Sequence, residues 1–236
     1  MSAPVLFFAF ADDSNDPLNL LKRERRNIKA ALRIHERDNK VQVEVEPGVS
    51  IEELYEVTRA YSDEIAIFHY GGHAGDTILR VESEDGGNEY AHAEGLAKHL
   101  GAQASLKLVF LNGCATKGWV EALLDNGVPA VIATSVEIED KMATEFAEQF
   151  YKEISNYASI KRSFDTATRF VETRYKGKKD ITVRTRGEQG WFGQPKKEDD
   201  SLPWSLYVAD DSDAALEWKL PESRVIKEVE LSLIHI

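Results

Sequence analysis

The chain has 236 residues, of which 42% are hydrophobic and 30% are charged, and its formal net charge is −12. These proportions are typical of a folded globular domain, and no apolar run approaches the roughly 18 residues of a membrane span, so we expect no membrane association. The acidic balance argues against a general nucleic-acid binder, whose binding surface is rich in Lys and Arg; it is compatible with simple solubility or with a cationic peptide partner.

Cysteine usage and the N-terminal segment both favour a cytoplasmic protein. Cys114 is the only cysteine, so there is no intramolecular disulfide framework. The opening residues MSAPVLFFAFADD contain no basic segment, and Asp12 and Asp13 interrupt their apolar run, so we expect no secretory signal.

Six segments have the length and composition of β-strands, some uniformly apolar and some alternating. In chain order they are VLFFAF (5–10), KVQVEVE (40–46), EIAIFHY (64–70), LKLVFLN (106–112), PAVIATS (129–135) and a last strand near 205–209. The segment GDTILRVESEDGGNEY (75–90) predicts an additional hairpin that turns at Asp85, Gly86 and Gly87.

Helical spacing of apolar residues fills most of the intervals between these strands. The expected helices cover Leu18 to Arg37, a short segment from Ser50, residues 91–100, Trp119 to Leu124, Ile138 to Ile154, and about 159–176. Asp16 is the expected N-cap of the first helix, whose KRERR face (22–26) we expect to be solvated. Ser50 and Glu53 form a capping box at the start of the second helix.

This alternation predicts the fold class. Uniformly apolar strands are typical of parallel sheets buried on both faces, so we expect an α/β three-layer sandwich with a mostly parallel central sheet of about six strands. The polar, Gly-rich segment 176–204 is expected to be a long surface loop, in which Trp191 and Phe192 are candidates for covering a crevice. Beyond Asp210 the pattern weakens, although VIKEVELSLIHI (225–236) alternates like an edge strand.

Two of the apolar strands stop at clusters of small residues that include a reactive side chain. IAIFHYGGHAG (65–75) contains His73, and LKLVFLNGCA (106–115) contains Cys114. Because reacting groups gather at the carboxyl ends of parallel strands, these side chains face one crevice if their strands are neighbours. His73 would then take the proton of Cys114 and leave a thiolate, which is the nucleophilic form of cysteine.

The surrounding backbone suits such a site. Gly72 permits close approach of backbone and substrate, and we expect Gly113 to adopt the strained angles of the turn that carries Cys114. Backbone N–H groups of this turn would form an oxyanion hole. A helix that begins near Lys117 would favour the thiolate through its N-terminal dipole.

The remaining histidines, and each of the two residues taken singly, have ordinary structural explanations. A lone cysteine is usually a small buried hydrophobic residue. His69 lies within its strand and is expected in the core or in support of the site, and His35, His92 and His99 lie on expected helices and should be structural. There is no CxxC pair, no HxxxH on a helix and no glycine-rich phosphate loop, so we predict no metal site and no cofactor.

The two clusters also carry a family resemblance. HYGGHAG (69–75) and LVFLNGCAT (108–116) resemble the histidine and cysteine motifs of the CHAT domain, a family of caspase-like, clan CD cysteine peptidases related to caspases, separases and gingipains. The similarity covers about residues 4–209, from PVLFFAF to LPWSLYV. It implies a caspase-like three-layer sandwich as one domain over residues 1–209. Residues 210–236 are then a C-terminal tail or a junction to a missing module.

The resemblance implies an activity and partners. By similarity, His73 matches the catalytic histidine and Cys114 the nucleophile of a cysteine endopeptidase that cleaves a protein substrate through a thioester acyl-enzyme. Members of the family commonly act in bacterial defence or programmed cell death, under the control of a fused or partner sensor module. A protein or peptide substrate and a regulatory partner are therefore expected.

The sequence departs from its relatives at the candidate substrate pocket. N-G-C stands where caspases have Q-A-C, and Asn112 occupies a position at which some arginine-specific relatives carry an acidic residue. Asp76, Glu137 and Asp140 are further pocket candidates. Alternatively, Asp76 opens a turn, and Glu137 and Asp140 complement a helix dipole. The sequence thus predicts no preference for the residue before the scissile bond.

Two other interpretations stay open from the sequence alone. In one, the domain keeps the fold and serves as a catalytically silent binding or signalling module. In the other, it is a flavodoxin-like or nucleotide-binding α/β domain, which fits the alternation but explains neither HYGGHAG nor the cysteine turn. The presence of both His73 and Cys114 in Gly-rich turns favours the enzyme.

Overall fold

The structure, a computed structural model, describes residues 2–13, 16–83, 85, 87–135, 137–175 and 203–222. Most of the predicted surface loop, with Trp191 and Phe192, and the predicted edge strand at 225–236 lie outside these residues. Within the described ranges, no helix is both long enough and apolar enough to cross a membrane.

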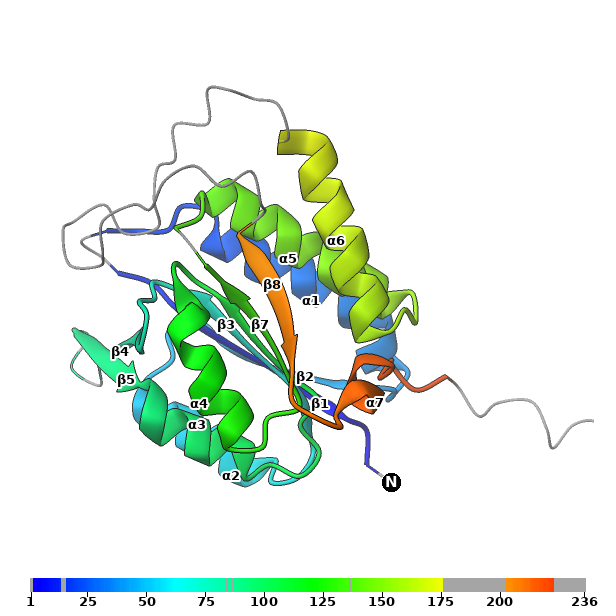
Figure 1. Cartoon of the computed structure of the whole chain (residues 1–236), viewed down its shortest axis with the longest axis horizontal. Coiled ribbons are helices and arrows are strands. Elements are labelled where there is room, and N and C mark those ends of the chain that lie inside the picture. Colours follow the sequence, from blue (N-terminus) through cyan, green and yellow to red (C-terminus); the bar gives the residue numbers. More distant parts are fainter. Residues whose placement is uncertain are drawn as a thin grey trace, which may run out of the picture.

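A six-stranded sheet runs through the centre of the molecule (Figure 1). Its strands are β1 (Val5–Ala11), β2 (Gln42–Glu46), β3 (Ile65–Gly72), β6 (Leu108–Asn112), β7 (Ala130–Thr134) and β8 (Trp204–Val208). Their order across the sheet is β2-β1-β3-β6-β7-β8, and every neighbouring pair is parallel except β7 and β8. The predicted mostly parallel, six-stranded α/β sandwich is confirmed.

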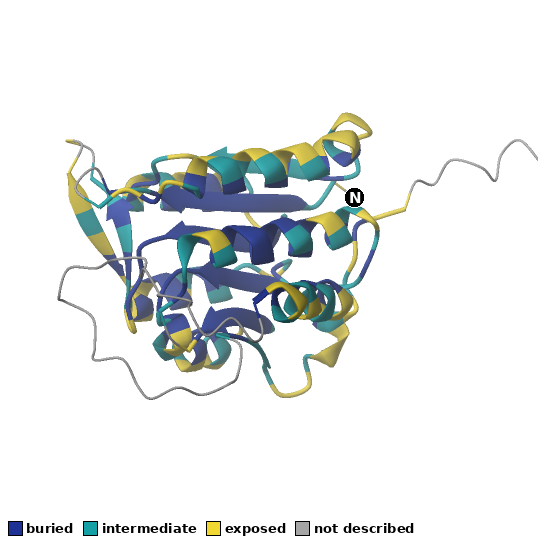
Figure 2. Ribbon diagram, turned by 90° about the horizontal axis from the view of Figure 1, so that it is seen from above, coloured by how far each residue is buried: buried dark blue, intermediate teal, exposed yellow. Residues whose placement is uncertain are grey.

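Helices cover both faces of this sheet (Figures 1 and 2). One face packs against α1 (Leu21–Arg37), α5 (Asp140–Ser155) and α6 (Ile160–Tyr175), and the other against α2 (Ile51–Ala60), α3 (Ala93–Gly101) and α4 (Trp119–Asp125). Three smaller elements complete the described chain. They are the antiparallel hairpin of β4 (Ile78–Glu82) and β5 (Asn88–His92), the 3₁₀-helix η1 (Thr116–Gly118) and α7 (Asp213–Leu216).

Alternation along the strands divides the interior into two cores. On β1, Leu6 and Phe8 belong to the core under α1 and α5, whereas Phe7 and Ala9 belong to the core under α2, α3 and α4. All 7 residues of β1 and all 8 residues of β3 are buried. Burial on both faces is therefore the reason why these strands are uniformly apolar in sequence.

The start of α1 differs from the prediction. The helix begins at Leu21 rather than Leu18, and its N-cap residue, Leu20, makes no side-chain capping bond, so the predicted capping by Asp16 is wrong. The Leu20 N–H donates instead to the Asp140 carboxylate at the start of α5, over 2.9 Å. The Asp140 carboxylate thus attaches the loop before α1 to α5. The loop is also closed on itself, because the Asp12 carboxylate accepts the Leu18 N–H at 2.9 Å.

The capping box of the second helix is predicted correctly, and the start of the third helix is wrong by two residues. The capping box of α2 is confirmed, because Ser50 Oγ accepts the Glu53 N–H at 3.2 Å while the Glu53 carboxylate accepts the Ser50 N–H at 2.8 Å. Such a cap contributes about 1 kcal/mol. His92, predicted to be helical, is the exposed last residue of β5, and α3 begins at the next residue.

The described chain after β8 remains packed on the domain. Leu220 is 1% exposed within the core under α5 and α6. The Ile160 N–H at the start of α6 donates to the Trp218 carbonyl at 3.0 Å. Residues as far as Leu220 therefore contribute to the same folded unit.

Candidate active site

The carboxyl ends of β3 and β6 lie side by side, and this arrangement places His73 and Cys114. The two strands are parallel neighbours, and the last pair in their register is Gly71 opposite Asn112. His73 and Cys114 each follow that pair by two residues. The two residues therefore leave the same edge of the sheet at the same level.

Both side chains lie on the side of the sheet that faces α1 and α5. Cys114 belongs to the core that these helices cover, and its Sγ atom lies 4.0 Å from the Ile138 carbonyl oxygen, just before α5. His73 reaches the loop before α1, where its Nε2 atom lies 2.7 Å from the Asp16 carbonyl oxygen. The exposed fractions of His73 and Cys114 are 4% and 3%, so both are shielded from bulk water.

The two turns that carry these side chains touch each other. A Cβ atom added to Gly113 would lie 2.5 Å from Ala74 Cβ and 2.9 Å from the Gly72 carbonyl oxygen. A Cβ on Gly72 would in turn lie 2.6 Å from the Ala11 carbonyl oxygen. Only residues without a side chain fit at both positions, so the close approach of the backbone that is predicted at Gly72 agrees with the geometry, and Gly113 is equally enclosed.

The strained residue of the cysteine turn is not the predicted one. Among the described glycines only Gly127 has a positive φ, so the expectation of strained angles at Gly113 is wrong. Ala115, directly after Cys114, has φ 49° and ψ 42° instead. Left-handed angles cost a residue with a side chain about 1–2 kcal/mol. Gly113 therefore provides space, and Ala115 carries the strain.

Two threonine hydroxyls, of Thr134 in β7 and of Thr116 in η1, connect the cysteine turn to β7. Thr134 Oγ1 donates to the Gly113 carbonyl at 2.6 Å and accepts the Thr116 N–H at 3.2 Å. Thr116 Oγ1 in turn accepts the Thr134 N–H at 2.9 Å. The helix predicted to begin near Lys117 starts as the 3₁₀-helix η1 and continues as α4.

The contacts of His73 define which ring nitrogen is basic. A carbonyl oxygen only accepts hydrogen bonds, so Nε2 donates its hydrogen to the Asp16 carbonyl at 2.7 Å. In the neutral ring, Nδ1 then carries the lone pair. The Asp16 carboxylate lies 4.0 Å from Nδ1, which provides a counter-charge for a protonated ring. His73 is therefore oriented to accept a proton at Nδ1.

The hairpin β4–β5 is anchored at the same edge of the sheet. Arg80 forms an ion pair with Asp13, just beyond β1, and the Arg80 N–H donates to the His73 carbonyl at 3.0 Å. The Tyr70 hydroxyl lies 2.7 Å from the same carbonyl oxygen. The backbone of His73 is thus held by its own strand and by the hairpin.

A buried carboxylate that sequence reasoning placed in solvent lies next to these turns. Glu24 of α1 is 0% exposed. Its Oε1 atom accepts the Asn112 amide at 2.8 Å and lies 3.3 Å from His69 Nε2, and Thr144 of α5 lies 3.4 Å from its Oε2 atom. One carboxylate therefore connects α1, β3, β6 and α5. The prediction that the whole KRERR face is solvated is wrong at Glu24.

Helical spacing contains the signal that identifies Glu24. The residue lies three positions after Leu21 and four before Ile28, on the same buried stripe as Leu32 and His35. A carboxylate within such a stripe must find a buried polar partner, because an unpaired buried charge is strongly unfavourable.

Asn112 and Asp140, two of the predicted pocket residues, form hydrogen bonds within the protein. Asn112 is 0% exposed, and its amide donates to Glu24 and to the Ala143 carbonyl at 3.2 Å. Asp140 accepts the Leu20 N–H, as described above. Both residues therefore support the turns at the candidate site from the α1–α5 side.

The other two predicted pocket residues are more accessible. Asp76 is exposed and lies against Gly118, where a Cβ atom would collide with its backbone and carboxylate. Glu137 is half-buried and precedes α5 by three residues. Asp76 therefore lies beside the chain that follows the cysteine turn, and Glu137 lies in the segment between β7 and α5.

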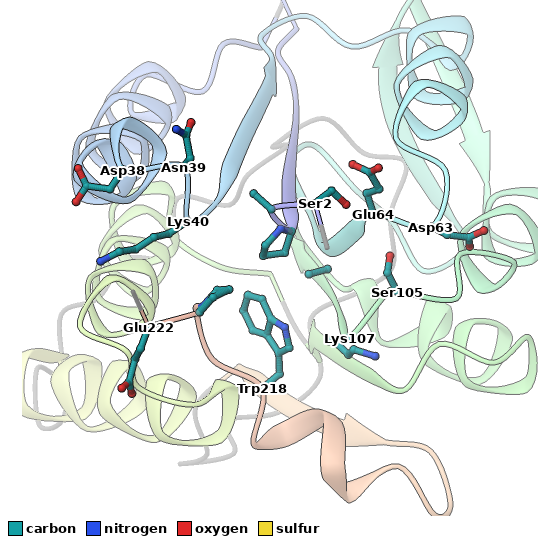
Figure 3. A pocket seen from close by; sticks show the side chains of 14 residues that line it. Ser2, Asp38, Asn39, Lys40, Asp63, Glu64, Ser105, Lys107, Trp218 and Glu222 are labelled. Carbon is teal, nitrogen blue, oxygen red and sulfur yellow. The ribbon is translucent and has the colours of Figure 1, made fainter. Parts of the chain in front are cut away.

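A hollow in the surface lies away from the edge that carries His73 and Cys114. It has a volume of about 740 Å³ and is lined by residues that precede the strands, among them Pro4, Lys40, Glu64 and Lys107, with Trp218 on its wall (Figure 3). It thus belongs to the amino end of the sheet, opposite to His73 and Cys114. In the part of the chain that the structure describes, no group of three or more His, Cys, Asp or Glu is arranged to hold a metal ion.

Three solved structures with a similar fold are cysteine peptidases. A secreted C11 cysteine protease from Bacteroides thetaiotaomicron aligns with TM-score 0.59 at 10% identity, over 78% of this chain and 63% of that one. The Drosophila initiator caspase Dronc aligns with TM-score 0.53 at 9% identity, over 88% and 79%. The Arg-specific proteinase gingipain R aligns with TM-score 0.52 at 15% identity, over 74% and 43%. Identities this low show the fold alone, and that fold is caspase-like.

The family follows from the sequence itself. The model of the CHAT domain matches residues 2–210, so the chain belongs to the CHAT domain family, as its motifs implied. No curated protein matches the chain. The chain spans less than two thirds of the C11 protease and of gingipain R, at 63% and 43% of their lengths. The flavodoxin-like interpretation is not supported by these neighbours.

Proposed function

We propose that the protein is a caspase-like cysteine endopeptidase in which Cys114 is the nucleophile and His73 is the general base. The supporting observation is that the turns after β3 and β6 are in contact and that both side chains lie on the α1–α5 side of the sheet. Membership of the CHAT family supports the same assignment.

In the proposed reaction, His73 Nδ1 takes up and releases a proton in each of two stages, formation of the thioester and its hydrolysis. This nitrogen takes the Cys114 proton, and the thiolate attacks the carbonyl carbon of the scissile peptide bond. The same nitrogen then gives its proton to the departing amine, which leaves a thioester. Water gives a proton to Nδ1, attacks the thioester carbon and releases the carboxylic acid, and the proton returns to the cysteine sulfur. Backbone N–H groups of the Gly113–Cys114 turn are the candidates for binding the oxyanion.

Substrate recognition is best tested at the accessible pocket candidates. Asp76 is exposed and Glu137 is half-buried, whereas Asn112 is fully buried and engaged by Glu24. We therefore assign the first two to contacts with a protein or peptide substrate and Asn112 to support of the cysteine turn.

The biological setting is proposed from the family. A regulated role in bacterial defence or cell death, in the cytoplasm and under the control of a sensor module or partner protein, is what membership of the CHAT family suggests. In this proposal residues 1–209 form the peptidase domain. Residues 210–236, which pack on that domain as far as Leu220, are its tail or its junction to another module.

A catalytically silent binding module is the second candidate. It is favoured by the burial of both reactive side chains, which are 4% and 3% exposed. Replacement of Cys114 by alanine separates the two candidates in the cell. A peptidase loses its function in this variant, whereas a binding module keeps it.

Thiol reactivity tests the dyad directly. Cys114 is the only cysteine, so every label introduced by a thiol-directed peptide probe reports on this residue. We expect labelling of the wild type, none of Cys114→Ala and slower labelling of His73→Ala. His92→Ala, which removes an exposed histidine from the end of β5, is the matched control and should label like the wild type.

Identification of newly cleaved protein termini after expression of the wild type and of Cys114→Ala tests the peptidase activity. We expect termini that appear only with the wild type, and their sequences give the preference before the scissile bond. If the same termini appeared with both proteins, the endopeptidase proposal would be abandoned.

A further inference from the structure

Helix α1 carries a concentration of positive charge that the proposed reaction does not use. Its 17 residues include seven Lys or Arg and two Glu, in a chain whose formal net charge is −12. One of the two acidic residues, Glu24, is buried. The outward surface of α1 is therefore strongly cationic on an otherwise acidic protein.

The exposed cations form one continuous row along the helix. Lys22, Arg26, Lys29, Arg33 and Arg37 are all exposed and follow one another at intervals of three or four residues. This spacing keeps their side chains within about 80° of the helix circumference and along about 22 Å of its axis. We call this row the basic stripe.

The basic stripe has few counter-charges from its own chain. Arg37 forms an exposed ion pair with the adjacent Asp38 at 3.3 Å, which contributes little. Among the described residues, the other four cations form no ion pair. In the described structure the stripe is thus accessible to carboxylates of a partner.

An exposed apolar side chain lies beside the basic stripe. Ile34 is 45% exposed and is one of the two large hydrophobic residues with such exposure in the described chain. Ala30, one turn earlier, is also exposed. The apolar face of α1 itself, with Ile28 and Leu32, is buried against the sheet, so α1 cannot enter a lipid surface as a membrane-binding amphipathic helix does.

We propose that the basic stripe and Ile34 dock an acidic helix of a partner protein. One cation per turn, about 5.4 Å apart, matches carboxylates at positions i and i+4 of a helix lying alongside, and Ile34 matches an apolar residue among them. A nucleic-acid backbone offers no apolar partner for Ile34. The surface therefore fits a protein.

The basic stripe lies on the helix that contacts the candidate site. α1 follows the loop in which the Asp16 carbonyl binds His73, and its inner side carries Glu24, which binds Asn112. A partner on the outer side of α1 contacts an element that positions both turns. Regulation of Cys114 reactivity by such a partner rests on the proposed peptidase function, whereas the docking itself does not.

Docking is tested on the full-length Cys114→Ala protein, so that the result is independent of catalysis. The probe is a fluorescent synthetic helix with glutamates at i and i+4 around leucines, titrated by anisotropy at low and high salt. We expect binding that weakens with ionic strength. The double variant Arg26→Glu with Arg33→Glu should weaken binding by roughly tenfold or more. Ile34→Ser should weaken it by about threefold.

Two exposed arginines of α6 provide the matched control. Arg162→Glu with Arg169→Glu has the same seven-residue separation on a helix and the same change in net charge, and should leave binding within about twofold of the parent. Equal weakening by both pairs, or no binding at low salt, would overturn the proposal. So would tighter binding of a DNA duplex than of the peptide through the same α1 residues. Urea unfolding verifies that each variant is folded.

Discussion

Helices α1 and α5 bring buried carboxylates to one face of the sheet, whereas the described helices on the other face, α2, α3 and α4, bury none. Glu24, Glu145 and Glu148 are 0%, 4% and 7% exposed. Glu148 is bound by Asn27 and Arg23 of α1, and Glu145 by Arg174 and Tyr175 of α6. The same strands supply both faces, so the helices make the difference.

The two faces of the sheet therefore contribute differently: one mainly stabilises the fold, and the other mainly positions the groups around the candidate site. Aliphatic and aromatic burial stabilises without directional demands, and this is what α2, α3 and α4 contribute. Buried charges stabilise little even when well paired, but they fix the relative position of the groups they join. Both His73 and Cys114 lie on the charged side. We therefore expect substitutions on the two faces to affect stability and thiol reactivity differently.

The largest loss of stability is expected on the apolar face. Phe68 is 0% exposed and packs edge-on against Phe7 with ring centroids 5.5 Å apart. Phe68→Ala should lower the free energy of unfolding by about 3–5 kcal/mol, because it leaves a cavity in the core. Urea denaturation measures this loss. At temperatures where the variant remains folded, the rate of Cys114 labelling should be close to that of the wild type.

Substitution of Glu24, unlike that of Phe68, should lower the rate of Cys114 labelling. Glu24→Leu leaves the Asn112 amide and His69 without their carboxylate, and should cost about 3 kcal/mol of unfolding free energy. Glu24→Gln keeps the shape and one acceptor and should cost about 1 kcal/mol. Both variants should label Cys114 more slowly than the wild type while folded.

Arg174→Gln is the control for the Glu24 variants on the same side of the molecule. It removes the half-exposed Arg174 side chain, which lies 3.2 Å from the Glu145 carboxylate. In sequence, Arg174 is far from both turns. The substitution should affect stability slightly and labelling not at all. If Glu24→Gln and Phe68→Ala changed the labelling rate equally, the division between the two faces would have to be given up.

The sequence predicted the strands well because each one has a single dominant signal. VLFFAF and IAIFHY are apolar without interruption, and such runs are buried in any packing of a parallel sheet. The sequence left open whether the strands that precede His73 and Cys114 are neighbours, and the structure shows that β3 and β6 pair directly. From the sequence, His73 and Cys114 could therefore be placed just beyond the carboxyl ends of two parallel strands, and the pairing of these strands brings the two residues to one edge.

The support of the site could not be predicted in the same way. The sequence pattern predicts Asp16 as a helix cap, but its carbonyl contacts His73, which is 57 residues away in the chain. The pattern predicts Glu24 in solvent, but Glu24 binds Asn112, which is 88 residues away. Capping and solvation are local signals, whereas these contacts exist only after α1 packs on the sheet. Strain at Ala115 likewise depends on how the turn fits between β6 and β7.

The contact between the two turns gives a prediction of intermediate size. A methyl group on Gly113 would meet Ala74 Cβ at 2.5 Å and the Gly72 carbonyl oxygen at 2.9 Å, so the turns must separate. Gly113→Ala should cost about 1–3 kcal/mol and slow the labelling of Cys114. Gly95→Ala in α3 is the control, because nothing lies within 4 Å of its added methyl group. It should stabilise the protein by about 0.5–1 kcal/mol; a similar effect of both changes would contradict contact between the turns.

The smallest effect concerns pH and the apolar face. His99 of α3 stacks on Tyr55 of α2 with ring centroids 3.9 Å apart, and its Nε2 atom lies 2.5 Å from the Thr58 hydroxyl. Burial, and secondarily the charge of Arg59, lowers the pKa of His99. Above the ordinary histidine pKa of about 6.5 the ring is neutral in both folded and unfolded chains. Below it, the unfolded chain binds the proton first, so stability falls as the pH falls.

Comparison of wild type and His99→Gln isolates this contribution, because the carboxylates titrate alike in both. We expect the wild type to lose more unfolding free energy than His99→Gln between pH 7.5 and pH 5, as measured by urea denaturation at each pH. Arg59→Gln removes the secondary cause and should reduce the pH dependence only in part. Identical pH dependence of wild type and His99→Gln would show that the α2–α3 contact accepts a charged ring. The apolar face would then tolerate buried charge as readily as the α1–α5 face does.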